Sequence, residues 1–272
     1  MASTFSISRA WDETRDIFRR DGGLYVAVAL AMIVLPEVAV GVIAPDPGNT
    51  PSGGVQLLRL LAGLIALIGQ LSIIRLAIGP STTVGDAIRH GARRFPSALG
   101  AIILLVIAMM LVTIPLVLVL APLLGADIAH MTAQPKGPEA TLILIVLLII
   151  IAISVRFTLL SPVSSAEEIG PIAILKRSWN LTTGRYWRLA GFVGLLLIAA
   201  IFLLFTAGII GGLLAKMVSP NIEPFSIGAL ILSLVAGAAQ GIFSVMAALM
   251  LARVYAQVAG RDAEASVPSS GT

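Results

Sequence analysis

Six long apolar runs, separated by short polar segments, set the strongest constraint on how this chain can fold. A helix that crosses a hydrocarbon core of about 30 Å needs about 20 largely apolar residues, and each run reaches that length. Only 12% of the residues are charged, about half the share typical of soluble domains, so most of the surface must face lipid. The sequence therefore predicts an all-α integral membrane protein whose membrane domain covers residues 23–258. The expected transmembrane helices are residues 24–44, 54–78, 97–124, 140–162, 189–216 and 225–252.

Basic side chains concentrate in every second connection between these runs. Eleven Lys and Arg residues lie before the first run and in the connections 79–96 and 163–188. The opposite connections hold a single basic residue, Lys136. Because short cytoplasmic loops are enriched in Lys and Arg, both termini are expected in the cytoplasm. All six Trp and Tyr residues lie near the same face, at the headgroup level that these side chains favour.

The charge and the cysteine content limit the classes of partner and site that can be expected. A pI near 10.0 is often typical of nucleic-acid binding, but here the net charge is only +4 and the basic residues adjoin apolar runs. No nucleic-acid partner is therefore expected. The chain has no cysteine, so it has neither a disulfide framework nor a thiolate metal site.

Residues 1–22 are expected to form an interfacial amphipathic helix, with a sparse apolar stripe that includes Trp11 and Phe18. Gly22 and Gly23 would end this helix. A cleaved signal peptide is the alternative for the first apolar run, but the acidic residues that precede the run fit that reading poorly. At the other end, residues 259–272 are expected to form a flexible cytoplasmic tail.

Two amphipathic elbows are expected between cytoplasmic helix ends. In the first, residues 81–95, Thr83 and Asp86 have the spacing of a capping box. The second, residues 164–188, repeats this plan, and Pro171 suits a fresh helix start. Its candidate caps are Ser164 with Glu167 and Ser165 with Glu168. Its expected inward face comprises Ile172, Leu175 and Trp179. The second and third apolar runs would then be a parallel copy of the fourth and fifth.

Two opposite charges lie inside the first two runs, where an unpaired ionisable group costs several kcal/mol. Glu37 and Arg59 would both lie roughly 8–10 Å below the outer surface, given the rise of 1.5 Å per residue. We expect an ion pair between them. The alternative is that Glu37 binds a proton or a substrate, aided by a kink at Pro36.

Three arginines lie near the cytoplasmic ends of the runs: Arg75, Arg156 and Arg253. Long basic side chains at this depth commonly reach out to the headgroups. The alternative is a cluster that faces Glu167 and Glu168 or binds a lipid phosphate, for which the planar guanidinium is suited.

Nothing in the sequence predicts catalysis. The two histidines, His90 and His130, fall on opposite sides of the expected membrane. No cluster of His and carboxylate residues has metal-ligand spacing, and HExxH, GxSxG, GxGxxG and GxxxxGK motifs are lacking. We therefore expect no enzyme activity, no metal and no cofactor.

The segment from Ala173 to Arg188, AILKRSWNLTTGRYWR, carries a family resemblance. Its basic pair, Ser-Trp, Leu-Thr, Gly and aromatic-Arg steps resemble the membrane domain of bacterial glycerophosphoryl diester phosphodiesterases and related six-helix inner-membrane proteins. The resemblance implies a multi-pass protein of the bacterial inner membrane. In that family the chemistry belongs to a soluble TIM-barrel domain with acidic metal ligands. The polar segment 259–272 is too short to supply it, so no phosphodiesterase activity is expected from these residues.

The leading functional hypothesis is a non-catalytic membrane module that binds membrane lipid or a protein partner at its cytoplasmic face. The candidate contacts are Arg75, Arg156, Arg253, Lys176, Arg177, Trp179, Trp187 and Arg188. The alternatives are a small-molecule or ion transporter that uses Glu37 and, third, an enzyme that acts on lipid headgroups.

Overall fold

The computed structural model describes residues 6–45, 52–79, 83–128, 135 and 137–260, and the regular elements among them are helical. In chain order these are α1 (Ile7–Ala29), the π-helical turn η1 (Leu30–Val34), α2 (Leu35–Ile43), α3 (Gly53–Ile78), α4 (Val84–Leu124), α5 (Pro138–Arg156), α6 (Leu160–Ala166), α7 (Pro171–Thr182), α8 (Tyr186–Val218) and α9 (Ile227–Ala259). Six helical stretches are long and apolar enough to cross a membrane: Ile7–Ile43, Gly53–Ile78, Val84–Leu124, Pro138–Ala166, Tyr186–Val218 and Ile227–Ala259. The predicted all-α fold with six apolar spanning helices is confirmed. The predictions for His130, Lys136, residues 81–82 and the tail beyond Gly260 lie outside the described residues.

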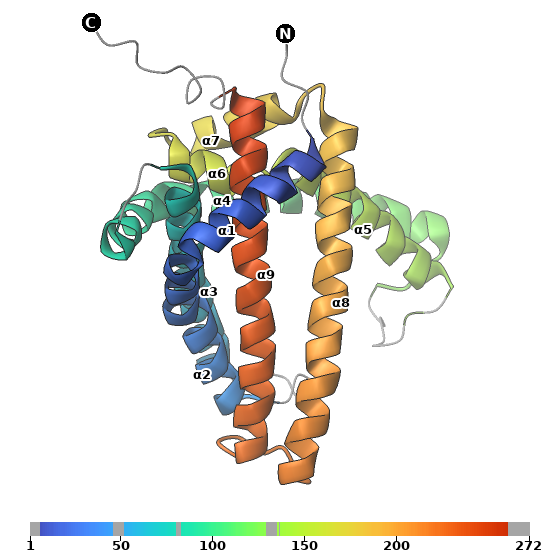
Figure 1. Ribbon diagram of the computed structural model, residues 1–272. Coiled ribbons are helices and arrows are strands. Elements are labelled where there is room, and N and C mark those ends of the chain that lie inside the picture. The colour runs from blue at the N-terminus through green and yellow to red at the C-terminus, as the bar shows by residue number, and fades with distance from the viewer. Residues whose placement is uncertain (1–5, 46–51, 80–82, 129–134, 136, 261–272) are drawn as a thin grey trace, which may run out of the picture.

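One end of the molecule gathers the start of α1, the end of α9, and the short helices α6 and α7 (Figure 1). The backbone N–H of Ser6 donates to Oε1 of Gln257 at 3.1 Å, so the first and last described segments meet there. We call this end the elbow face, because the connection from α5 to α8 and the start of α4 also lie on it. The connection between α8 and α9 lies at the opposite end.

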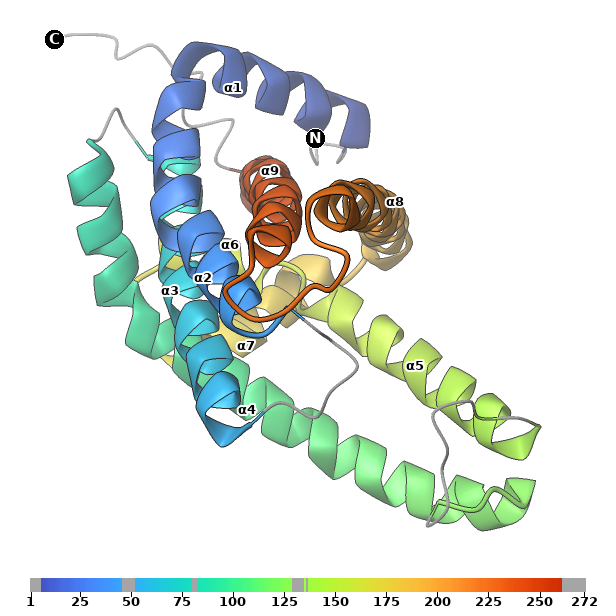
Figure 2. The ribbon, with the colours of Figure 1, turned by 90° about the horizontal axis from the view of Figure 1, so that it is seen from below.

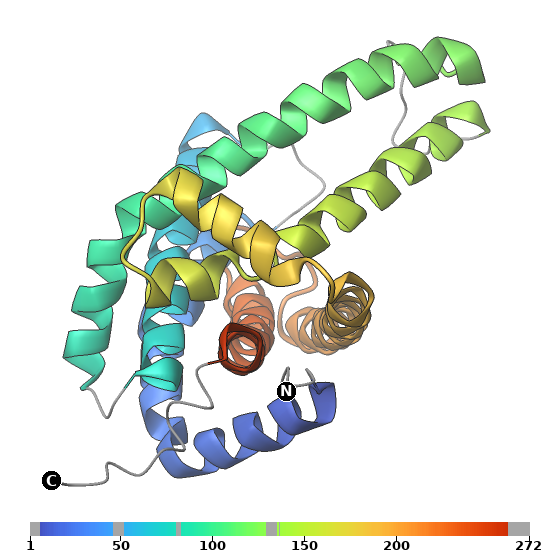
Figure 3. The same ribbon diagram turned by 90° about the horizontal axis from the view of Figure 1, so that it is seen from above.

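Helix α1 bends at Asp21, whose backbone is non-helical (φ −123°, ψ 16°). The part before the bend lies across α9 at the elbow face rather than along it (Figures 1 and 3). Its buried residues are Ala10, Thr14 and Ile17. Trp11 and Phe18 remain 48% and 37% exposed. The predicted apolar stripe is therefore divided into a row that packs on the protein and an exposed aromatic row, and Gly22 follows a bend rather than a helix end.

Helix α9 is the centre of the bundle, with α8 on one side and α1, η1, α2 and α3 on the other (Figure 2). Small residues recur at every fourth position along its first half: Ala229, Ser233, Gly237 and Gly241. A Cβ added at Gly237 would lie 2.9 Å from Cγ2 of Val38, and one at Gly241 would lie 2.5 Å from Cγ2 of Val34. Small residues at such positions let helix backbones approach closely in membranes, where dispersion contacts drive association.

A π-helical turn interrupts the first spanning stretch. In η1 the N–H of Leu35 donates to the carbonyl of Leu30, five residues earlier. Pro36 has no backbone N–H, so the carbonyl of Met32 loses its usual helical donor, and a local change of helix geometry accommodates this loss. The turn brings the side chain of Val34 against Gly241 of α9.

The two elbows have different forms. The first is the amphipathic start of α4, where Oγ1 of Thr83 accepts the N–H of Asp86 at 3.2 Å, as the capping spacing predicted. Pro96 then follows, and α4 changes direction before it runs beside α5 away from the other helices (Figures 2 and 3). No residue of the most apolar 18-residue stretch of α4 is buried in the protein. The second elbow is built from the separate helices α6 and α7, so the two expected copies differ in form here.

Candidate functional site

The break between α6 and α7 is held by the carboxylate of Glu167. Its Oε1 accepts the hydroxyl of Tyr255 at 2.7 Å and Nε of Arg177 at 3.0 Å. The Glu167 side chain is only 16% exposed, so these charge-assisted bonds are better shielded from water than a surface pair. They join the α6–α7 segment to α9 on one side and to α7 on the other.

Neither serine of the predicted capping box caps α7. Ser164 and Ser165 are buried within α6, and Oγ of Ser165 donates to the carbonyl of Leu71 in α3 at 3.0 Å. Helix α7 instead begins at Pro171, with Gly170 at the cap position and no side-chain cap. The capping prediction for the second elbow is wrong, because α6 continues the helix through both serines and the break follows them.

The start of α4 is fastened to the same segment. Nε2 of His90 lies 2.8 Å from the carbonyl oxygen of Ser165, and Arg94 forms an ion pair with Glu168. His90 is half-buried. The two adjacent glutamates therefore serve as partners for groups on α4, α7 and α9.

Arg156, at the end of α5, lies between two aromatic rings. Its guanidinium carbon is 4.9 Å from the ring centroid of Trp179 and 4.9 Å from that of Tyr186. The Trp179 ring also lies 5.8 Å from Phe157, and the Tyr186 ring meets Trp187 edge-on at 5.4 Å. A continuous row of stacked side chains thus joins the ends of α5 and α7 to the start of α8. Cation–π contacts of this kind are worth about 0.5–1 kcal/mol each at partly exposed sites.

The backbone of Arg156 is tied to α7 as well. Its carbonyl oxygen accepts the hydroxyls of Ser178 at 3.1 Å and Thr182 at 3.3 Å. The Tyr186 hydroxyl donates to the carbonyl of Ala152, one turn earlier in α5, at 3.1 Å. The Ser178 and Thr182 bonds supply partners for the Arg156 carbonyl, which lies in the last turn of α5 and lacks a helical donor.

The other two arginines of the predicted cluster lie at the end of α3. Nη2 of Arg253 donates to the carbonyl of Ala77 at 2.5 Å, and the Tyr25 hydroxyl donates to Leu76 at 3.4 Å. A cation at a helix C-terminus is favourable because the last carbonyls carry partial negative charge. The Arg75 guanidinium folds over Gly79 in the same region. Arg253 therefore binds the end of α3, whereas Arg156 binds aromatic rings.

The exposed side of α7 and the start of α8 carry basic and aromatic side chains together. Trp187 is 84% exposed, and Trp179 is 47% exposed although one of its faces contacts Arg156. Lys176, Arg177 and Arg188 are exposed beside them. We call these five residues the basic–aromatic surface.

Helix α7 faces the protein with a different row from the one predicted. Its buried residues are Ile174, Ser178, Leu181 and Thr182. Ile172 is 62% exposed and Leu175 is only partly buried, so the predicted inward face is rotated. The reason is that Ser178 and Thr182 turn toward the protein, where their hydroxyls donate to the Arg156 carbonyl. The apolar positions that were expected to face inward are thereby turned outward.

Glu37 and Arg59 do not meet. Both side chains are exposed, and the ion pairs that the structure records in the described part of the chain do not include them. Their positions along the helices gave similar depths, but depth does not fix the rotation of a helix about its axis. In the described residues, no group of three or more His, Asp or Glu side chains is placed to hold a metal ion.

In a comparison with protein-family models, residues 5–258 match a domain of unknown function, DUF7847. The chain belongs to the DUF7847 family. No curated protein matches it, and no solved structure does. This DUF7847 chain is a multi-pass membrane protein by its six apolar helices, and the family match covers the elbow face and the whole helical bundle.

Sequence reasoning missed several features of the DUF7847 bundle. The fourfold spacing of small residues that includes Gly237 and Gly241 is a readable signal for close helix packing, and Pro36 is a readable signal for an irregular turn nearby. The Arg156 stack gave no such signal. Its members come from three separate segments, so their meeting depends on how α5, α7 and α8 pack.

Proposed function

We propose that the protein is a non-catalytic membrane module of the bacterial inner membrane, and that its elbow face lies in the cytoplasmic headgroup layer and binds lipid there. The basic–aromatic surface carries this proposal. Trp side chains favour the headgroup level, where the ring meets hydrocarbon and the N–H meets water. Lys and Arg beside them attract anionic lipids at about 1 kcal/mol per charge near the surface.

The stacked row beneath the surface supports this reading. Arg156 holds one face of Trp179 and one face of Tyr186, which in turn contacts Trp187. Arg156 therefore restrains the rings of Trp179 and Tyr186, and the Tyr186 ring gives Trp187 a neighbour to pack against. A surface held in this way loses less side-chain entropy on binding than a loose one.

The proposed orientation of the protein in the membrane rests on the positions of the charged and aromatic residues. The elbow face carries the connections rich in Lys and Arg, and these favour the cytoplasm. The resemblance of AILKRSWNLTTGRYWR to the membrane domain of glycerophosphoryl diester phosphodiesterases fits a non-catalytic role for this part of the chain. Transport through Glu37 gains no support, because its side chain is exposed rather than set among polar groups.

The test uses Trp187 as the only tryptophan, in a W11F/W179F variant. The protein is reconstituted in vesicles that mix phosphatidylglycerol with phosphatidylcholine, with bromine near the headgroup end of the acyl chains of one lipid at a time. We expect the bromine to quench Trp187, and more strongly when phosphatidylglycerol carries it. Lys176→Gln with Arg188→Gln should remove that difference, whereas Arg89→Gln with Arg93→Gln on α4 should keep it.

Absence of quenching by either lipid would overturn the proposal. If Trp187 were shielded in native membranes and became accessible on purification, a protein partner would be the better explanation of this surface. Equal quenching by both lipids would support the interfacial position of Trp187 and contradict the preference for phosphatidylglycerol.

A further inference from the structure

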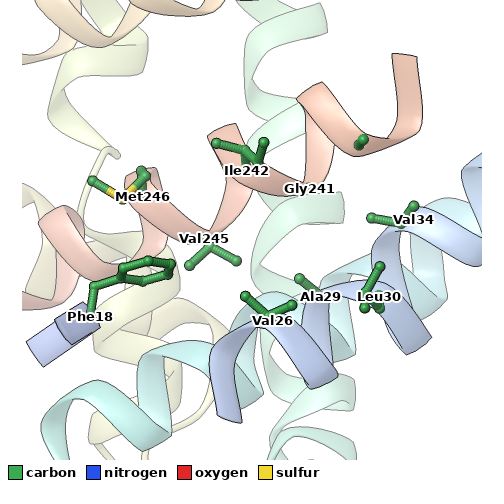
Figure 4. A pocket seen from close by; sticks show the side chains of 10 residues that line it. Phe18, Val26, Ala29, Leu30, Val34, Gly241, Ile242, Val245 and Met246 are labelled. Carbon is green, nitrogen blue, oxygen red and sulfur yellow. The ribbon is translucent and has the colours of Figure 1, made fainter. Parts of the chain in front are cut away.

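A groove opens between the first helix and α9 below the bend at Asp21. It has a volume of about 250 Å³. One wall comes from α1 and η1, the other from α9, and the Phe18 ring lies at one end (Figure 4). The lining residues on α1 and η1 are Val26, Ala29, Leu30 and Val34, and those on α9 are Ala238, Gly241, Ile242, Val245 and Met246.

The chemistry and size of the groove restrict what it can hold. The lining side chains are all apolar, so a polar solute would lose its hydrogen bonds to water and gain none. A helix from a partner is about 10 Å across with its side chains, and one long enough to follow the groove would need several times its volume. A single hydrocarbon chain meets both conditions.

The length of the groove matches one leaflet of a bilayer. From Val26 to Val34, and from Ala238 to Met246, each wall covers eight steps along its helix, or about 12 Å at 1.5 Å per residue. One leaflet contributes about 15 Å of hydrocarbon. The Phe18 end belongs to the part of α1 that lies across the elbow face (Figure 1). The groove therefore runs from the elbow face into the hydrocarbon core.

Two basic residues flank Phe18 on α1. Arg15 lies three residues before Phe18 and four after Trp11, so all three share one side of the helix, and Arg19 lies one turn beyond Arg15. Arg15 and Arg19 are exposed. Arg20 is paired with Asp21, whereas the structure records no ion pair for Arg15 or Arg19 within the described residues. Asp16 lies between Arg15 and Arg19, and residues 15–21 together carry a net charge of +1, so the charge next to the open end of the groove is positive.

We propose that this groove holds one acyl chain of an anionic phospholipid whose phosphate is bound by Arg15 and Arg19. The inference rests on the proposed function, since it names a lipid site on the same face, but it concerns α1 and α9 rather than α7 and α8. Guanidinium groups suit the phosphate because they donate two hydrogen bonds in a fixed plane. The part of α1 that carries Arg15 is fixed by its buried residues Ala10 and Thr14 and by the packing of α1 on α9.

The experiment uses the purified full chain in a mild detergent, with phosphatidylglycerol or phosphatidylcholine added at equal concentration and bound lipid counted by native mass spectrometry. We expect wild-type protein to retain phosphatidylglycerol at least fivefold more than phosphatidylcholine. Ala238→Phe places a ring in the groove at an exposed position and should lower the number of retained phosphatidylglycerol molecules by one. Ala199→Phe, at an exposed position of α8, is its control and should retain lipid.

The charge is tested by Arg15→Gln with Arg19→Gln. This double variant should reduce the preference for phosphatidylglycerol by the share that the groove contributes, the same share that Ala238→Phe removes, because lipid at the basic–aromatic surface is unaffected. Arg89→Gln with Arg93→Gln removes the same charge from another pair of exposed residues spaced by four on the elbow face and should keep the preference. If both double variants lose the preference equally, the effect is one of general surface charge and the proposed site is wrong.

A second measurement needs no variant. Phosphatidylglycerol with a photoreactive diazirine in its acyl chain should label α9 between Ala238 and Met246 when bound to the wild-type protein. Labelling confined to other segments would overturn the proposal. If the groove variants leave lipid binding unchanged while brominated lipid still quenches Trp187, the groove site is wrong and the proposed function stands. Loss of the Trp187 signal with retained labelling of α9 would instead remove the proposed role of the basic–aromatic surface.

Discussion

The guanidinium carbon of Arg156 lies 4.9 Å from the ring centroid of Trp179, and Trp179 remains 47% exposed. A cation from the end of α5 thereby orients an aromatic side chain on α7. The same guanidinium contacts Tyr186 at the start of α8. One residue thus sets the relative position of three helix ends on the elbow face.

Arg156→Gln should destabilise the protein. It removes two cation–π contacts, so the free energy of unfolding should fall by about 1–2 kcal/mol. Thermal unfolding in detergent, followed by Trp fluorescence, measures this change. Arg188→Gln is the control, because Arg188 is exposed. Equal midpoints for the two variants would show that the stack adds nothing to stability.

Glu167→Gln tests the anchor between α6 and α7. The change weakens the bonds from Tyr255 and Arg177, and hydrogen bonds to charged groups contribute about 1.5–3 kcal/mol. We expect a loss of about that size in chemical unfolding. Glu168→Gln is the neighbouring control: Glu168 is 86% exposed, so its pair with Arg94 should matter by less than about 1 kcal/mol.

The Tyr255–Glu167 bond can be isolated by a double-mutant cycle. Tyr255→Phe and Glu167→Gln should each cost stability, but the double variant should cost less than the sum, because both single changes disturb the same bond. The unfolding free energies of the four proteins give the coupling. If the stability loss of the double variant equals the sum of the two single losses within about 0.3 kcal/mol, the bond does not couple α9 to the elbow.

The fold could be predicted from the sequence to the level of six spanning helices because the length of an apolar run reports directly on membrane crossing. The capping spacing at Thr83 also gave the correct helix start. The same reasoning failed at Ser165, since a spacing rule cannot tell whether a preceding helix has already ended. The rotation of each helix about its axis could not be predicted from the sequence either. The expected pair of Glu37 and Arg59 rested on depth alone, and the ion pairs recorded among the described residues do not include it.

The candidate site was predictable only in part. Lys176, Trp187 and Arg188 lie on an exposed surface, and their polar or amphipathic character in an apolar chain made them conspicuous. The partners of Arg156 and Arg253 were not predictable, because each binds a group on a helix distant in sequence. Local pattern identifies which residues are unusual, whereas tertiary packing decides what they touch.

Gly237→Leu tests the close approach of α2 and α9. A Cβ at this position would lie 2.9 Å from Val38, so the larger side chain should force the helices apart and cost about 1–3 kcal/mol. Val38→Ala in the same protein should recover part of the loss by making room. Gly208→Leu on α8, where an added Cβ meets nothing within 4 Å, should leave the thermal midpoint nearly unchanged. Similar losses for both glycines would show that leucine at a spanning-helix glycine is harmful in itself.

The side of the membrane on which the elbow face lies can be tested with single cysteines, because the chain has none of its own. Asn180 on α7 and Asn221 between α8 and α9 are both exposed, and each can be changed to Cys with little effect on packing. Positive charge on the elbow face favours the cytoplasm, so a membrane-impermeant maleimide should label Asn221→Cys in intact cells and Asn180→Cys only after permeabilisation. The reverse pattern would invert the orientation and place the basic–aromatic surface outside. Labelling of both in intact cells would mean that α8 does not cross the membrane.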